Sequence, residues 1–156
     1  MGKRQVRKAA RGYDVVISTY PLGCHATGAL RKQGKLAIPA VGFLSGDDPR
    51  VLATIEQVER RLLDQGFVRR YDTDQGADGL PPGEGAFLPC TFWYADALVL
   101  AGRRAEARAV FDRMLALRND VGLLSEEVDP STSRLLGNFP QAWSHVTLVN
   151  TATLLS

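Results

Sequence analysis

Cysteine is scarce in this chain, which contains only Cys24 and Cys90. Two cysteines can form neither a disulfide framework nor a four-ligand zinc site. The sequence also contains no glycine-rich phosphate loop and no spacing typical of metal ligands. We therefore expect a protein of a reducing, cytoplasmic-type compartment that uses no cofactor and no metal.

Long apolar runs are absent as well. No uninterrupted apolar stretch is long enough to cross a bilayer. The basic residues after Met1 are not followed by the apolar region of a signal peptide. These absences predict a protein without a membrane partner.

Lysine is missing from most of the chain, because all four lysines precede Leu36. Residues 1–35 contain eight basic residues and one acidic residue, a net charge of +7, whereas residues 36–156 have a net charge of −5. This break predicts a basic N-terminal segment of unrelated origin over residues 1–37 and a main domain over residues 38–156. No aromatic platform accompanies the basic residues, so we favour a solvated segment over a nucleic-acid partner.

The composition of the whole chain is that of an ordinary globular domain, with 45% hydrophobic and 23% charged residues. The first part contains short apolar segments. They predict a strand over residues 13–19, a short helix over 26–32 and an extended segment over 36–44. After residue 48 the pattern becomes helical, so the chain is predicted to be mainly α with a short α/β segment at its N-terminus.

Helical signals then follow one another along the chain. Asp48 is a good N-cap, Pro49 suits the first helical position, and Gly66 ends this helix. Residues 87–101 are apolar almost all round, which indicates a helix covered on both sides. Residues 103–118 are amphipathic and follow directly, which predicts an antiparallel helical pair. The helix that starts after Asp48 has an apolar stripe of Val51, Ile55, Val58 and Leu62. The helix over residues 103–118 has a stripe of Ala107, Val110, Met114 and Leu117. A last helix is predicted over 140–155.

Two long loops, residues 72–85 and 119–138, lie at the ends of these mostly buried helices, where functional residues often gather. The second loop carries the acidic cluster Ser-Glu-Glu-Val-Asp-Pro at residues 125–130. Hydrolysis of a glycosidic bond needs two carboxyl groups flanking the bond. Spacing and charge alone favour a solvated acidic turn, in which Asp129 caps the turn before Pro130.

Several consecutive motifs resemble glycoside hydrolase family 15, which includes glucoamylase-like and trehalase-like enzymes. The longest are residues 122–145 (GLLSEEVDPSTSRLLGNFPQAWSH) and residues 83–93 (GEGAFLPCTFW). Residues 38–44 (IPAVGFL), 101–108 (AGRRAEAR) and 115–123 (LALRNDVGL) resemble the same family. The motifs occur in the family's order over roughly three quarters of the chain.

The resemblance implies a partial (α/α)6 toroid, the fold of six helical hairpins, and hydrolysis of α-glucosidic bonds with inversion. It implies that Glu126 is the general base, with Glu127 as the alternative. Because the two residues are neighbours, we expect their side chains to point in different directions. Starch-type oligosaccharides and trehalose are the substrates that it suggests.

Sugar-binding candidates come from the same motifs. Trp93 and Trp143 could stack on a sugar, although core packing is favoured for such large aromatics. Glu84 could face the sugar or stabilise the positive end of a helix. His145 is expected to be a hydrogen-bonded core residue rather than a catalytic one.

The chain also departs from the family's pattern. No segment resembles the one that carries the family's general acid, and the toroid needs more helical hairpins than this chain supplies. We therefore expect a truncated domain with weak or no activity alone, because loss of a general acid costs about 10²–10⁴-fold in rate. The alternative is a non-catalytic helical module that binds carbohydrate or a protein partner, or that self-associates through exposed apolar helix faces.

A second, shorter resemblance concerns the N-terminal segment. Residues 13–22 (YDVVISTYPL) and 28–36 (GALRKQGKL) resemble a stretch of monogalactosyldiacylglycerol-synthase-like glycosyltransferases. Together with the break in composition, this favours a junction of two unrelated coding segments near residues 36–41.

Overall fold

A computed structural model describes residues 40, 42–71 and 85–156. Helices dominate these residues, which confirms the mainly α prediction. The helices are α4 (Pro49–Arg61), α5 (Leu88–Leu100), α6 (Arg104–Ala116) and α7 (Ala142–Leu155). The strands are β1 (Leu63–Asp64), β2 (Phe67–Val68), β3 (Ala86–Phe87), β4 (Glu127–Val128) and β5 (Leu135–Leu136). Within the described ranges, none of the helices has the length and apolar character needed to cross a membrane.

The start of α4 follows the predicted capping pattern. The side chain of Asp48 accepts a hydrogen bond from the backbone N–H of Arg50 at 2.9 Å, and Pro49 occupies the first turn. The helix buries Val51, Ile55 and Val58 of the predicted stripe. It ends at Arg61 with Leu62 as its C-cap, so the predicted end at Gly66 was wrong.

A hairpin that the sequence pattern does not predict follows α4. Strands β1 and β2 pair antiparallel across a two-residue turn, Gln65–Gly66, in which both residues have positive φ. Such turns match the twist of paired strands. Glycine adopts positive φ freely, whereas Gln65 gives little sign of it in the sequence.

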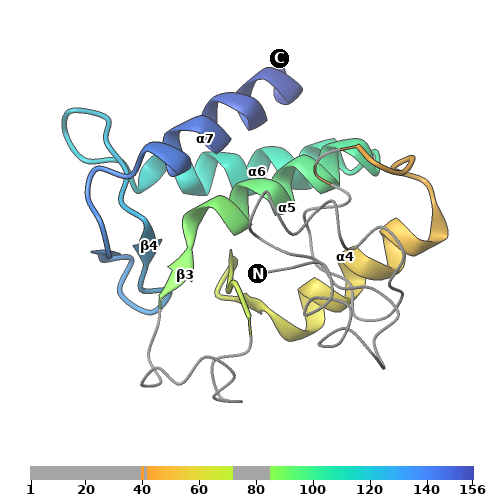
Figure 1. Ribbon diagram of the computed structural model, residues 1–156, viewed down its shortest axis with the longest axis horizontal. Coiled ribbons are helices and arrows are strands. Elements are labelled where there is room, and N and C mark those ends of the chain that lie inside the picture. Colours follow the sequence, from red (N-terminus) through yellow and green to blue (C-terminus); the bar gives the residue numbers. More distant parts are fainter. Residues whose placement is uncertain (1–39, 41, 72–84) are drawn as a thin grey trace, which may run out of the picture.

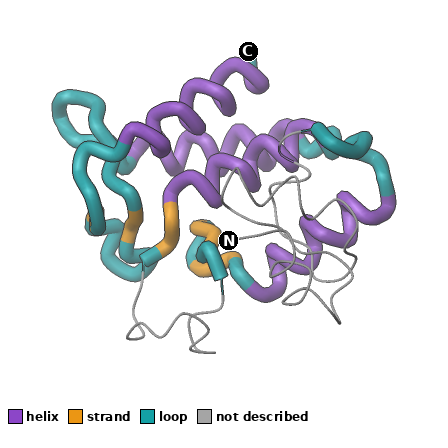
Figure 2. Tube along the Cα trace, in the orientation of Figure 1, coloured by secondary structure: helices purple, strands orange, loops and turns teal. Residues whose placement is uncertain are grey.

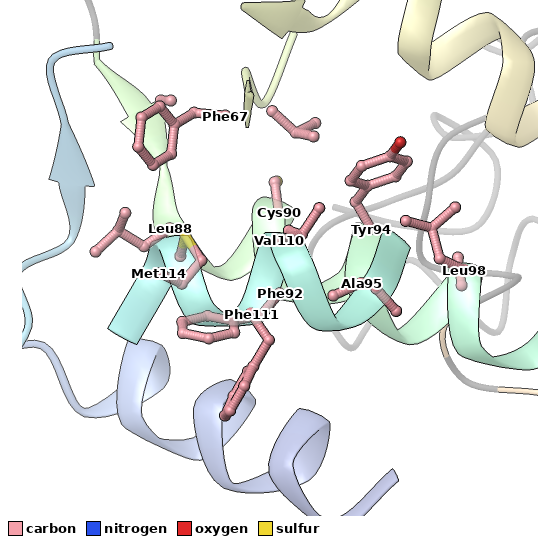
Figure 3. Close-up of a cluster of buried hydrophobic side chains, with 14 of the residues drawn as sticks. Phe67, Leu88, Cys90, Phe92, Tyr94, Ala95, Leu98, Val110, Phe111 and Met114 are labelled. Carbon is pink, nitrogen blue, oxygen red and sulfur yellow. The ribbon is translucent and has the colours of Figure 1, made fainter. Parts of the chain in front are cut away.

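Helix α5 is the centre of the described structure, with α6 and α7 packed against it (Figure 1). Its side chains are buried almost all round, as predicted for residues 87–101. Phe92 of α5 packs edge-on against Phe111 of α6, with ring centroids 6.3 Å apart (Figure 3). A helix covered on both sides in this way can carry apolar residues on every face.

The loop predicted over residues 119–138 contains regular structure, so that prediction was wrong in part. Strands β3, β4 and β5 form a three-stranded antiparallel sheet in the order β3-β4-β5, set among loops (Figure 2). Glu127 lies opposite Phe87 on one side and opposite Leu136 on the other. Strands of two residues are too short to show an alternating pattern.

The extended segment predicted over residues 36–44 is also not a strand where it is described. Residues 42–44 form a turn and bends, Gly42 has a φ of +64°, and Phe43 is 69% exposed. The strand predicted over residues 13–19 and the helix predicted over 26–32 lie outside the described residues.

A buried carboxyl group joins α5 to α7. Asp96 has no exposed surface, and its Oδ2 accepts a hydrogen bond from Asn150 Nδ2 at 2.8 Å. Its Oδ1 has no hydrogen-bond partner in the part of the chain that the structure describes. Burial raises the pKa of Asp96 above the ordinary value of 3.8, against the opposing effects of the side chains of Thr151 and Asn150.

This raised pKa predicts a pH-dependent stability. Because the folded state holds the Asp96 proton more tightly than the unfolded chain, the free energy of unfolding falls as the pH rises from 3.8 through the raised value. Above the raised pKa of Asp96, the folded state has lost all of the stability that the bound proton contributed. The Asp96→Asn variant cannot ionise, so we expect it to be more stable than the wild type by about 1–2 kcal/mol at neutral pH.

Urea unfolding at a series of pH values measures this difference, which should shrink as the pH approaches 3.8. The exposed Glu56 supplies the control, since Glu56→Gln should keep the wild-type pH dependence. The explanation fails if Asp96→Asn unfolds with the same pH dependence as the wild type.

Candidate active site

The backbone around Glu126 is tied to the start of α5 and to the loop before α7. The N–H of Glu126 donates to the carbonyl of Asn138 at 2.9 Å, and its own carbonyl accepts from the N–H of Leu88 at 2.9 Å. Strands β3 and β4 lie beside the beginning of α5, near the end at which α7 starts (Figure 1). Glu126 therefore stands where three segments meet that are far apart in the sequence.

The two residues before Glu126 are fixed by the first turn of α7. Leu124 donates its N–H to Nε2 of His145 at 3.2 Å and accepts from the N–H of Gln141 at 3.0 Å. The carbonyl of Ser125 accepts from the hydroxyl of Ser144 at 2.7 Å. Leu124, Ser125 and Ser144 are buried, so these contacts satisfy polar groups that water does not reach.

The carboxylate of Glu126 is held by one of its two oxygens. Oε2 accepts from the side-chain amide of Asn138 at 2.7 Å and from its backbone N–H at 3.2 Å. Within the described residues Oε1 accepts no hydrogen bond. The side chain is half-buried, so it is fixed in direction while one oxygen stays available.

Gly137 makes the approach of this carboxylate possible. A Cβ atom at this position would lie 3.0 Å from Cβ of Glu126 and 3.1 Å from its Oε2. Its φ of +73° is also one that glycine adopts without strain. The sequence analysis gave no role to Gly137 or to Asn138.

Glu127 is held differently, since its Oε2 accepts from the backbone N–H of Gly85 at 3.2 Å. These hydrogen bonds tie Glu126 to Asn138 and Glu127 to Gly85, as expected for neighbours that point in different directions. Gly85 is close-packed here, because a Cβ would lie 2.8 Å from the carbonyl oxygen of Val128.

Asp129 is the turn cap that the sequence predicts. Its Oδ1 accepts from the backbone N–H and the hydroxyl of Ser131, and its Oδ2 accepts from the hydroxyl of Thr132. The Ser131 hydrogen bond is the largest cause that lowers the pKa of Asp129 to about 2. Asp129 thus closes the β4–β5 turn and stays ionised at ordinary pH.

Aromatic side chains line the region beside the acidic pair. The ring of Trp143 lies edge-on to Trp93 at 6.0 Å and to Phe87 at 6.4 Å. Residues directly opposite in an antiparallel pair project to the same face, so Phe87 and Glu127 share one face of the sheet. Trp93 is half-buried against the core, whereas Trp143 is 39% exposed.

Arg70 belongs to this region, and the sequence analysis did not identify it. Its guanidinium carbon lies 5.4 Å from the centre of the Phe87 ring and 5.1 Å from that of Tyr71. These are cation–π distances. Arg70 meets Phe87 only because the fold brings the two residues together, so no local sequence motif could have revealed this contact.

Two further expectations concern what the site contains. Glu84 lies outside the described residues, so its place relative to the carboxylates is not part of this geometry. Across residues 40, 42–71 and 85–156, His, Cys, Asp and Glu side chains form no group of three that could hold a metal ion.

Comparison with known families decides the assignment. The family model described as glycosyl hydrolases family 15 matches residues 7–153. The chain belongs to this family. The trehalase of Mycolicibacterium smegmatis is 42% identical over 108 residues, which are 69% of this chain and 16% of that protein. The trehalase of Thermoplasma acidophilum is 41% identical over 121 residues, 77% of this chain and 20% of that protein.

The family 15 chain described here thus spans at most about a fifth of the length of these curated relatives. A third, the trehalase of Mycobacterium tuberculosis, is 39% identical over 74% of this chain and 17% of its own length. No solved structure matches the chain.

The family 15 match begins at residue 7 and therefore runs over residues 13–36, the segment that resembles glycosyltransferases. That second resemblance receives no support from the comparisons. The division of the chain at residue 37 stays a prediction.

Gly137 offers a test of how Glu126 is held. We expect Gly137→Ala to displace the Glu126 carboxylate, because the new methyl group would meet it at 3.0–3.1 Å. The matched control is Gly122→Ala, whose φ is +85° with no atom within 4 Å of the added Cβ. Both variants should lose about 1–2 kcal/mol from the unfavourable backbone conformation.

Only Gly137→Ala should shift the NMR signals of the Glu126 carboxyl carbon and the Asn138 side-chain amide. Equal shifts in both variants, or in neither, would show that Gly137 does not govern the position of Glu126.

Proposed function

We propose that this chain supplies the general base and part of the sugar-binding wall of a family 15 glycosidase that hydrolyses α-glucosidic bonds with inversion. The observation that carries the proposal is the Glu126 carboxylate, with Oε2 fixed by Asn138 and Oε1 without a hydrogen bond among the described residues. A base must accept a proton in a fixed direction, and this arrangement provides one.

In the proposed step, Oε1 of Glu126 accepts a proton from a water molecule. The water oxygen attacks the anomeric carbon while the bond to the leaving oxygen breaks on the opposite face, which inverts the configuration. The leaving oxygen needs a proton from a second carboxylic acid. We propose that this chain carries no such acid and has weak or no activity alone on ordinary glucosides.

The aromatic residues support a sugar as the ligand. The exposed part of Trp143 offers a face to the apolar C–H groups of a pyranose, and Trp93 supports it from the core side. Arg70, which rests on Phe87, brings a guanidinium group to the same region. Glu84 remains a further candidate for sugar binding.

Trehalases are the relatives reported above, so trehalose is the first substrate to test, followed by starch-type oligosaccharides. We expect the protein to act in the cytoplasm.

A substrate with a good leaving group tests the base separately from the missing acid. Fluoride departs from α-glucosyl fluoride without needing a proton, so the wild type should hydrolyse it and release β-glucose. Trehalose and maltose should be hydrolysed at least about 10²-fold more slowly. The Glu126→Gln variant keeps the size of the side chain but cannot accept the proton, and we expect it to lose about 10²–10⁴-fold in rate.

The Glu127→Gln variant is the matched control and should retain most of the hydrolysis of α-glucosyl fluoride. If Glu127→Gln loses the activity and Glu126→Gln keeps it, the two residues exchange roles. Equal rates in the wild type and both variants would remove the acidic pair from catalysis.

A second candidate function rests on the outer face of α7. Val146 and Val149 are 66% and 61% exposed, one turn apart, and continue from the partly exposed Trp143. The helix contains no Asp, Glu, Lys or Arg between Ala142 and Leu155. An exposed apolar face without charges is typical of an interaction surface. We propose that this face mediates self-association in a protein that then serves as a helical binding module.

Sedimentation velocity at increasing protein concentration tests this candidate. Wild type should form a dimer, and the Val146→Glu/Val149→Glu double variant should stay monomeric, because burying two carboxylates against a partner is costly. Val121→Glu is the control, since Val121 is 70% exposed but lies in a turn outside α7. A wild type that is monomeric throughout would exclude this function.

A further inference from the structure

The ring of His145 links α7 to the residues that precede Glu126. Nδ1 lies 2.7 Å from the carbonyl oxygen of Gln141, and Nε2 lies 3.2 Å from the backbone nitrogen of Leu124. A carbonyl only accepts a hydrogen bond and a backbone N–H only donates one. Both contacts are satisfied only when the ring is neutral and carries its proton on Nδ1.

We propose that His145 is a positioning residue for Glu126. The hydrogen bond from the Leu124 N–H to Nε2 of the neutral ring, which we call the latch, holds Leu124 to α7. Protonation of the ring breaks this hydrogen bond and loosens the segment that carries the base. This inference rests on the proposed role of Glu126. It concerns how the base is held, and not the identity of the base itself.

The physical reason is a reversal of one hydrogen-bonding group. A second proton on the ring occupies Nε2 and turns it from an acceptor into a donor. Two donors then face each other at the Leu124 contact, and the buried N–H of Leu124 loses its partner. An unsatisfied buried donor is unfavourable, so the segment has to move away from the ring.

The effect on Glu126 is direct because only Ser125 separates it from Leu124. The other contacts of this segment keep it near its place. They are the bonds from Gln141, Ser144 and Leu88 and the bond to Asn138. Loss of one contact among these therefore loosens the segment without unfolding it.

Other charged groups on the elements packed around α7 are engaged elsewhere. Asp96 of α5 is bonded to Asn150, Arg104 of α6 to the carbonyls of Leu154 and Ser156, and Arg118 to the carbonyl of Leu115. Arg108 and Asp112 on the exposed side of α6 pair with each other, and Arg113 bonds to the carbonyl of Gly66. Asp120, which precedes Leu124 in the loop between α6 and α7, is exposed. His145 itself is half-buried, so protons can reach it from solvent.

Hydrogen exchange of single amides, followed by NMR on the whole chain, tests the latch. Imidazole is the side chain that gains its proton between about pH 8 and pH 5, so rates are measured at both ends of this range and corrected for intrinsic exchange. In the wild type, acidification should lower the protection of the Leu124 amide by about fivefold or more. Protection of the Glu126 amide should fall by about twofold, and that of Phe92 in α5 should not change.

Two variants separate the latch from a merely structural role. His145→Gln offers an amide oxygen as acceptor that does not titrate, so Leu124 should stay protected at both pH values. His145→Leu has no acceptor, so protection should be low at both. The proposal is overturned if wild-type protection does not change while the ring signals show that His145 has become protonated. It is overturned equally if His145→Gln loses the protection as His145→Leu does, or if Leu124 responds and Glu126 does not.

This test does not depend on hydrolysis. If Glu126→Gln leaves the hydrolysis of α-glucosyl fluoride unchanged, the proposed function fails while the exchange results stand. If the exchange results fail, the assignment of the base is unaffected.

Discussion

The candidate site depends on one constraint, the need to satisfy the buried backbone groups between Leu124 and Glu126. The N–H and C=O groups of Leu124 and Glu126, and the carbonyl of Ser125, all have partners on other elements. Buried backbone groups without partners are costly, so this segment has few alternative positions. The Glu126 carboxylate gains a fixed direction from this backbone and from Asn138, and among the described residues none of its hydrogen bonds comes from a charged group.

The same constraint connects the site to the core. The partners of the segment lie at the beginning of α5, at the beginning of α7 and in the loop before α7, and these two helices pack against each other. Helix α5 can be apolar on nearly every face because α6, α7 and β2 cover it. Burial of this kind makes the rigid scaffold on which a loop can hold a functional group. Asp96 is the exception in that interface, a buried acid held by Asn150.

The sequence predicted the four described helices well, because each spans several turns and carries a repeated pattern or a cap. Asp48 with Pro49 marked the start of α4, and the apolar run after residue 87 marked α5. Most of the short strands escaped prediction for the opposite reason. Two residues cannot show a period, and the pairing of Phe87 with Glu127 joins positions 40 apart in the chain.

The site was predicted unevenly for similar physical reasons. Spacing and charge favoured a solvated turn at residues 125–130, and only the family resemblance selected Glu126. Asp129 was recognisable because its hydrogen bonds are local, to Ser131 and Thr132. Asn138, Gly137 and Arg70 were not recognisable, because each acts through a contact that the fold creates. Their neighbours in the sequence give no sign of those contacts.

The central claim is that Glu126 and the aromatic residues beside it face a bound sugar. The most direct measurement is an NMR titration of the isotope-labelled chain with trehalose, followed at every assigned backbone amide and at both tryptophan indole N–H groups. The account predicts that the shifts gather at Glu126, Glu127, Asn138 and Trp143, with little change along α4. Shifts that gather on α4, or no shifts at saturating trehalose and maltose, would contradict it.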